Sequence, residues 1–270
     1  MPELVKSPFI SPPEEFSAGM RELYSTPRRQ VRLDLKLPVR VRGRDSQDCE
    51  WAELTHFINV NQMGARIILS RPTEPGRILQ LTSALPSQLR GFDFAEAQYR
   101  VWAVVVNTAF VQAQGPEPLQ IEAGVAFIGP RPPQEFEADP SKLYEIVAAP
   151  VGAEPWRVRE LPYSGAKGEA SRPETRHPIA VEIELQSFAK QGAETVSELT
   201  VTENLSCKGA AVFTTLDLQE GRYVRVVSAH PTVSLLAAVR LRRSGGDGHT
   251  RLHLEFINGE WPFEGVESPP

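Results

Sequence analysis

Cysteine is almost absent from this chain, which has only Cys49 and Cys207 in 270 residues. Two thiols in separate halves of the sequence do not form a disulfide framework, and they fit a reducing cytosol. They are also too few for a zinc site without histidines at metal spacing. No run approaches the ~20 apolar residues that cross a bilayer, and the first residues lack the basic start and apolar core of a signal peptide. We therefore expect a cytoplasmic protein without a membrane span.

The common signatures of catalysis are absent as well. The sequence contains no G-x-S-x-G, P-loop, G-x-G-x-x-G or H-E-x-x-H motif. His249 and His253 have the spacing of a metal-binding pair only on a helix. Leu252 and Leu254 flank His253 in an alternating pattern, so this histidine is expected on the polar face of a strand. We expect no enzymatic activity, no catalytic residue, no metal site and no cofactor.

Charge is low and of mixed sign. The net charge of −5 gives the whole chain no electrostatic reason to bind nucleic acid or an anionic membrane. A cluster of aromatic residues on which bases could stack is also missing. Basic character is local and is confined to two clusters, Arg28, Arg29 and Arg32 in the first half and Arg240, Arg242 and Arg243 in the second. We expect the second cluster to be the solvated face of a strand, and we do not expect nucleic acid among the partners.

What the sequence does contain is a series of short segments in which apolar and polar residues alternate. Leu33, Leu35 and Leu37 point to one side of such a segment, which is typical of a half-buried strand, and Pro38 suggests an edge position. About six segments in each half, separated by glycine and proline turns, predict an antiparallel barrel or sandwich. The expected strands lie near residues 33–42, 51–60, 65–69, 77–82, 99–106 and 120–127, and near 179–186, 198–202, 210–214, 223–228, 235–241 and 251–257.

The two halves also share a polar motif. In the second half, two arginines separated by three residues precede a polar turn, and the motif comprises Arg172, Arg176, Asn204, Ser206 and Gly209. In the first half the corresponding positions are Arg28, Arg32, Asn59, Asn61 and Gly64. Equivalent positions lie about 145 residues apart, and the similarity extends to residues 74–86 and 219–231. Duplication of one domain is the simplest interpretation.

The 24 prolines cluster outside the alternating segments and mark the domain limits. Asp139 and Pro140 are suitable first residues for a short helix in the linker, which we expect to run through Leu143, Ile146 and Val147. The end of the linker is rich in glycine and small residues and is expected to be flexible. The predicted organisation is a tail at 1–27, a first domain at 28–130, a linker at 131–171 and a second domain at 172–265.

The motif of the second half suits a small anionic ligand that carries guanine. Two guanidinium groups can bind a phosphate, or the acceptor edge of a guanine, through paired hydrogen bonds. Asn204 and Ser206 add donors and acceptors for a base edge. Gly209 can adopt a positive φ and so permits the turn.

At these residues the sequence resembles the PilZ family of cyclic di-GMP receptors, whose two signatures are R-x-x-x-R and [D/N]-x-S-x-x-G. The resemblance implies that each half is a six-stranded PilZ-like barrel. It also implies that Arg172 and Arg176 hold the phosphates and guanine edges of cyclic di-GMP, while Asn204 and Ser206 bind a guanine. The first half keeps the arginines but has Asn61 where the family has serine. A non-binding or weaker first barrel is therefore favoured, and a second site there stays open.

The resulting expectation is a tandem receptor that binds cyclic di-GMP chiefly through its second barrel. Such a receptor signals through a change in the linker and in the interdomain arrangement, limited by the ligand's differential affinity for the two states. An unidentified protein partner would receive the signal. The alternative is an adaptor that binds protein partners through its barrels without any ligand.

Overall fold

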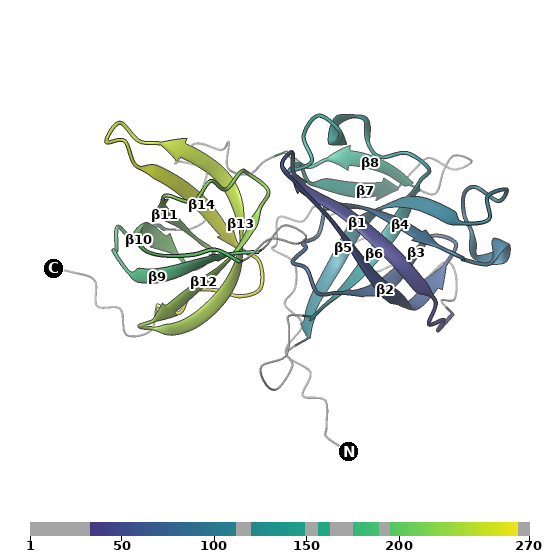
Figure 1. Cartoon of the computed structure of the whole chain (residues 1–270), viewed down its shortest axis with the longest axis horizontal. Coiled ribbons are helices and arrows are strands. Elements are labelled where there is room, and N and C mark those ends of the chain that lie inside the picture. The colour runs from purple at the N-terminus through teal and green to yellow at the C-terminus, as the bar shows by residue number, and fades with distance from the viewer. Residues whose placement is uncertain (1–32, 112–119, 149–155, 163–174, 189–194, 264–270) are drawn as a thin grey trace, which may run out of the picture. The chain divides into compact units, whose positions relative to one another are not determined.

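The computed structural model describes residues 33–111, 120–148, 156–162, 175–188 and 195–263 (Figure 1). These residues form two closed six-stranded antiparallel barrels and a separate two-stranded sheet. The helical segments among them are two 3-10 turns, Ser87–Leu89 and Gln134–Phe136. The predicted fold class, two antiparallel barrels in tandem, is confirmed. In the described part of the chain, no helix has the length and apolar content of a membrane span.

The first barrel has the strand order β1–β2–β3–β6–β5–β4. Its strands are β1 (Pro38–Ser46), β2 (Cys49–Asn61), β3 (Gly64–Leu69), β4 (Ile78–Ser83), β5 (Tyr99–Val111) and β6 (Gln120–Gly129). Alternation places one side of each strand inside; in β1, Val39 and Val41 are fully buried while Arg40 is exposed. The edge position predicted for Pro38 is wrong, because a closed barrel has no edge strand. Pro38 is instead the first residue of β1, a position that tolerates its missing N–H.

The second barrel has the equivalent order, β10–β11–β14–β13–β12–β9. Its strands are β9 (Glu182–Ser187), β10 (Ser197–Ser206), β11 (Gly209–Thr214), β12 (Tyr223–Ala229), β13 (Thr232–Ser244) and β14 (Thr250–Phe256). Gly245–Gly248 forms the β13–β14 connection, as the sequence predicted. Aliphatic side chains from all six strands fill the core, and the rings of Phe256 and Trp261 stack with centroids 6.2 Å apart.

The two barrels repeat one another in detail. The pairing of β2 with β3 is irregular between Phe57 and Asn59, and that of β10 with β11 is irregular between Thr202 and Asn204. A second pair of irregularities occurs at equivalent places, in β5 between Val105 and Asn107 and in β13 between Val239 and Leu241. Bulges of this kind redirect side chains and are specific features of a fold. Their repetition agrees with the duplication inferred from the sequence.

The helix predicted in the linker is not formed. Leu143, Ile146 and Val147 lie next to or within strand β7 (Tyr144–Ala148), which pairs with β8 (Trp156–Glu160). The Asp139 carboxylate accepts a hydrogen bond from the Ser141 backbone N–H at 3.0 Å, which stabilises a turn where the helix was expected to begin. Ile and Val also favour strands over helices, and the pairing across β7 and β8 outweighs the capping signal.

Strands β7 and β8 belong to the same compact unit as most of the first barrel. The Tyr144 N–H donates to the Gly76 carbonyl at 2.9 Å, and the Trp156 indole donates to the Phe127 carbonyl at 2.9 Å. Part of the segment predicted as a linker is therefore attached to the first barrel. The tail at residues 1–27 and the glycine-rich end of the linker lie outside the described residues.

The barrels differ most in one connection. In the second barrel, His230 and Pro231 alone join β12 to β13, whereas residues 84–98 join β4 to β5 in the first. This longer loop is held by Arg90, whose buried guanidinium donates to the carbonyls of Leu85 at 2.8 Å and Glu96 at 2.6 Å. The guanidinium also lies 5.5 Å from the centre of the Tyr99 ring. The loop is therefore an ordered part of the first barrel.

Tyr99 makes the stability of this region sensitive to alkaline pH. Burial of the phenol raises its pKa to about 12 from 10.0. The pKa of Tyr99 is higher in the folded than in the unfolded protein. Its contribution to the free energy of unfolding is therefore complete below pH 10 and is lost as the pH rises toward 12. We expect Tyr99→Phe to remove up to about 2–3 kcal/mol of the stability difference between pH 8 and pH 12. Urea unfolding of both proteins at the two pH values measures this, and an equal loss in both would contradict it.

Candidate ligand-binding site

The β10–β11 hairpin carries the polar turn of the second barrel. Ser206 and Gly209 form its last pair, and Cys207 and Lys208 make the turn between them. The Ser206 hydroxyl is buried and donates to the Gly209 carbonyl at 3.2 Å. The end of β14 and the segment after it also hold the turn. The Phe256 N–H donates to the Lys208 carbonyl at 2.8 Å, and the Trp261 N–H donates to that of Cys207 at 2.7 Å. The turn is therefore fixed on both sides.

Gly209 is needed for close approach and not for a special backbone angle. Glycines with positive φ in the described residues are Gly76, Gly129, Gly221 and Gly248, so Gly209 does not use the positive φ that glycine can adopt. A Cβ atom on Gly209 would lie 2.3 Å from the Leu254 carbonyl oxygen of β14. Gly64 of the first barrel has the same relation to the Val125 carbonyl, also at 2.3 Å. Each glycine allows a neighbouring strand to pass against the turn.

The segment before β9 brings Arg176 to this hairpin. His177 forms an isolated antiparallel bridge with Leu205, with N–H···O distances of 2.8 and 2.9 Å, and its ring lies 5.2 Å from that of Phe263. Arg176 precedes the bridge, and its Nη1 donates to Asn204 Oδ1 at 3.3 Å. The structure thus brings together two of the predicted site residues from separate parts of the sequence. Arg172 lies outside the described residues.

Three neighbouring strands place Asn204, Ala211 and His253 in one row. Asn204 of β10 pairs with Ala211 of β11, which pairs with His253 of β14. Ala210 and Val212 belong to the barrel core, so Ala211 points to the outer face, where its methyl group is nevertheless fully buried. We call this row the ligand face. Its middle position has only a methyl group, with an amide on one side and an imidazole on the other.

His253 was not among the predicted site residues. Leu252 and Leu254 on either side of it are buried in the core. The alternating pattern therefore correctly indicates that the His253 side chain points away from the core. Its place beside Ala211 and Asn204 depends on the pairing of β11 with β14, and no local pattern in the sequence reports that pairing. A cross-strand register is needed to find this residue.

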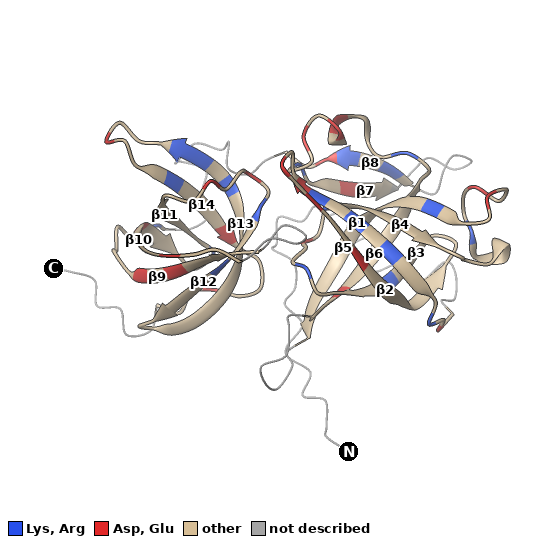
Figure 2. Ribbon diagram, viewed as in Figure 1, with Lys and Arg blue, Asp and Glu red and all other residues tan. Residues whose placement is uncertain are grey.

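The arginines of β13 and β14 near this face are paired with carboxylates. Arg251 bonds to Glu203 at 2.7 Å and to Asp247 at 2.7 Å, and its guanidinium lies 4.7 Å from the Phe213 ring centre. Hydrogen bonding from Arg251 holds the pKa of Asp247 well below its usual range. Arg240 is bound to Glu255 at 2.6 Å, and Figure 2 shows basic and acidic positions interleaved in this barrel. Arg176, by contrast, donates a hydrogen bond to Asn204.

The corresponding row of the first barrel is Asn59, Arg66 and Gly124. Arg66 replaces the methyl group of Ala211 with a long side chain, and its Nη1 lies 2.6 Å from Glu122 Oε1. Asn61 bonds within its own turn, where Oδ1 accepts from the N–H groups of Met63 at 2.9 Å and Gly64 at 3.0 Å. The first barrel thus differs from the second both in this row of residues and in the polar turn.

The long β4–β5 loop also contacts this turn of the first barrel. A Cβ atom on Gly91 would lie 2.4 Å from the Gln62 carbonyl oxygen, and Gln62 Nε2 donates to the Gln88 carbonyl at 3.0 Å. A bridge between Leu33 and Val60 reproduces the one between His177 and Leu205. Arg28 and Arg32 precede Leu33 and lie outside the described residues.

Within the described ranges, no group of three or more His, Cys, Asp and Glu side chains lies in a position to hold a metal ion. Neither the buried Cys49 nor the exposed Cys207 forms a disulfide.

No family model and no curated protein matches the sequence. Solved structures with some similarity include the Bacillus subtilis inhibitor of motility MotI/DgrA, at 12% identity and a TM-score of 0.28 over 84% of this chain and 90% of that one. Escherichia coli YcgR in complex with c-di-GMP has 11% identity and a TM-score of 0.27, over 83% and 76%. The K. pneumonia MrkH–c-di-GMP complex has 10% identity and a TM-score of 0.27, over 82% and 79%. Similarity this low supports no argument about the present chain.

The close approach at Gly209 leads to a stability prediction. Gly209→Ala places a methyl group against the Leu254 carbonyl, and we expect the second barrel to lose about 1–3 kcal/mol. Gly246→Ala is a matched control, because no atom lies within 4 Å of a Cβ at that position and its φ is not positive. The control is expected to change stability by less than about 0.5 kcal/mol. Denaturant unfolding compares the two, and equal effects would contradict the steric explanation.

Proposed function

We propose that the second barrel binds cyclic di-GMP on the ligand face. The observation that carries the proposal is the Arg176–Asn204 contact beside Ala211, which joins both halves of the sequence motif. The first arginine of the motif, Arg172, lies four residues earlier in the chain and would supply the second guanidinium. The function is therefore ligand recognition and involves no chemical step.

The chemistry of the ligand face suits a flat base next to a phosphate. A guanidinium donates paired hydrogen bonds to phosphate oxygens or to the O6 and N7 acceptors of guanine. The Asn204 amide both donates and accepts, so it can match a base edge. Ala211 projects only a methyl group, so a purine can lie close to the strand once the groups that now cover this methyl have moved aside. His253 closes the other side of the row, and we add it to the proposed contacts.

Ser206 is assigned a supporting role. Its hydroxyl is buried and bonded to the Gly209 carbonyl, so it holds the turn from which Asn204 projects. Gly209 has a similar role through the approach of β14. Arg172, Arg176 and Asn204 are then the residues that contact the ligand directly.

The first barrel is proposed not to bind, or to bind more weakly. Arg66, paired with Glu122, puts a long charged side chain where the second barrel has the methyl group of Ala211, and Asn61 is engaged within its turn. The β4–β5 loop lies against the same turn. These three differences oppose a second site at Arg28, Arg32, Asn59, Asn61 and Gly64.

The signal is proposed to be a change in the linker and in the interdomain arrangement when Arg172 and Arg176 converge on one ligand. A protein partner would detect that change. The adaptor function without a ligand is favoured by one observation, the exposure of Leu199 (85%) and Val201 (38%) on the same face of β10. Absence of cyclic di-GMP binding by the intact protein would leave the adaptor as the better explanation.

The first test is the contribution of Arg176. We expect Arg176→Ala to weaken cyclic di-GMP binding by roughly 10- to 150-fold, the range for loss of a charged hydrogen-bonding group. Arg243→Ala removes an exposed positive charge at the end of the same barrel and is expected to leave the affinity nearly unchanged. Isothermal titration calorimetry of the full-length variants measures both. Equal weakening by the two substitutions would mean that only overall charge matters.

The second test introduces the side chain of the first barrel into the second. Ala211→Arg is expected to abolish binding, because a long side chain then fills the centre of the ligand face. The reciprocal change, Arg66→Ala, is expected to leave affinity and stoichiometry unchanged. Circular dichroism confirms that each variant is folded before titration. A folded Ala211→Arg protein with unaltered affinity would place the ligand elsewhere.

A further inference from the structure

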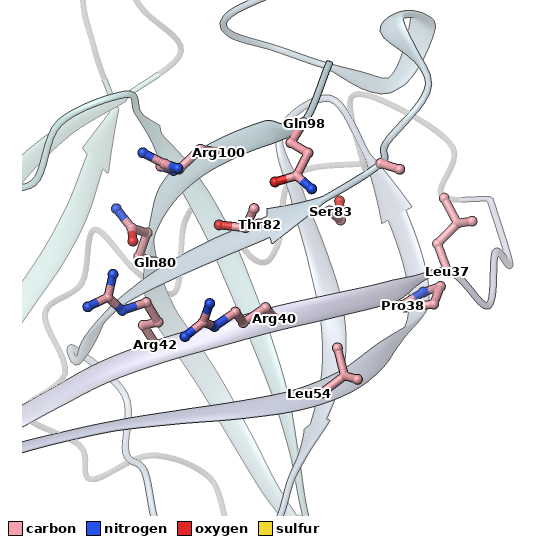
Figure 3. Close-up of a pocket in the computed structure, with 11 residues that line it drawn as sticks. Leu37, Pro38, Arg40, Arg42, Leu54, Gln80, Thr82, Ser83, Gln98 and Arg100 are labelled. Atoms are coloured by element: carbon pink, nitrogen blue, oxygen red, sulfur yellow. The ribbon is translucent and has the colours of Figure 1, made fainter. Parts of the chain in front are cut away.

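The first barrel has a pocket on its outer face, away from its polar turn. The pocket has a volume of about 450 Å³ and is lined by residues of β1, β4, β5 and their neighbours. Three arginines border it, Arg40 and Arg42 from β1 and Arg100 from β5 (Figure 3). None of them belongs to the motif shared by the two barrels. All the lining residues lie within one compact unit.

Strand geometry explains why these arginines converge. Val39 and Val41 are buried in the core, so Arg40 and Arg42 both point outward and their Cα atoms are about 7 Å apart. Arg100 pairs with Thr82 of β4, and β4 lies between β1 and β5. Neighbouring strands are ~4.8 Å apart, so the arginines face each other across about 10 Å. Figure 3 shows Gln80 and Thr82 between them.

Two of these arginines, Arg40 and Arg100, have no balancing acid in the pocket. No Asp or Glu is among the described residues that line it. Within the described residues, Arg40 and Arg100 form no ion pair, whereas Arg66 pairs with Glu122 and Arg77 pairs with Glu74 in the same barrel. Like charges at this spacing, such as those of Arg40 and Arg100, raise one another's energy, and a bound anion lowers it.

We infer that this pocket binds a small phosphorylated molecule of about nucleotide size. Three guanidinium groups match a ligand with two or more negative charges, and each can donate paired hydrogen bonds to phosphate oxygens. The Thr82 hydroxyl and the Gln80 amide add neutral donors on the floor. The volume lies in the range of small-molecule sites, roughly 300–1,000 Å³.

The other end of the pocket is apolar, which favours an organic phosphate over inorganic phosphate alone. Leu37, Pro38 and Leu54 line this end, and Leu54 is 76% exposed. A ring or sugar attached to the phosphates would cover Leu54. An acidic peptide is the competing occupant. Such a peptide spreads its charges along an extended chain, whereas these arginines all line one pocket of about 450 Å³.

The test is calorimetric titration of the full-length protein with inorganic pyrophosphate and with ADP. We expect both to bind, ADP more tightly, with affinity falling as salt is raised. Arg40→Gln and Arg100→Gln are each expected to weaken both ligands roughly tenfold or more. Arg157→Gln, at an exposed arginine on β8 of the same unit, is the control for overall charge and is expected to leave binding unchanged.

Three results would overturn the inference. One is the absence of pyrophosphate and ADP binding by the folded protein. Another is equal weakening by Arg157→Gln, which would show a general charge effect. The third is tighter, Arg40-dependent binding of a polyglutamate peptide, which would identify a peptide site. Arg176→Ala is expected to leave ADP binding intact, so failure of this inference and failure of cyclic di-GMP binding in the second barrel are separate outcomes.

Discussion

The approach of one backbone carbonyl to one glycine sets the geometry of each barrel's polar turn. At Gly209 the Leu254 oxygen occupies space that any other residue would need for its Cβ atom. This contact brings β14 against β11 in a single register, and that register aligns Asn204, Ala211 and His253. The bridge between His177 and Leu205 then adds Arg176 to the same end of the barrel. Backbone pairing therefore determines which side chains lie together at the candidate site.

The two barrels show how little has to change for such a face to be lost. They share strand order, bulges and the glycine contact, so their backbones offer the same scaffold. The differences lie in side chains and in one loop. Arg66 stands where the other barrel has Ala211, and residues 84–98 lie against the turn. Function on a shared fold is decided at such positions, since the fold alone does not imply a ligand.

Local patterns in the sequence predicted the strands and the duplication, because alternation and turn residues act over a few positions. They failed where a distant partner decides the outcome. The predicted helix through Ile146 became a strand because β8 pairs with it, and Gly209 proved to need space and not a positive φ because β14 passes beside it. His253 was missed for the same reason, since its neighbours belong to other strands. Arg176 and Asn204 were predicted together because the motif itself spans the distance between them.

The place of β14 in the second barrel has a consequence for protein synthesis. β14 is the last of its six strands to leave the ribosome, yet it lies between β11 and β13. Until it emerges, both of these strands have unpaired edges, which are the surfaces through which nascent chains associate wrongly. The same strand supplies His253 and the carbonyl that packs against Gly209. Closure of the barrel and alignment of Asn204, Ala211 and His253 are thus one event, so a nascent chain completes this row only when it also loses its exposed edges.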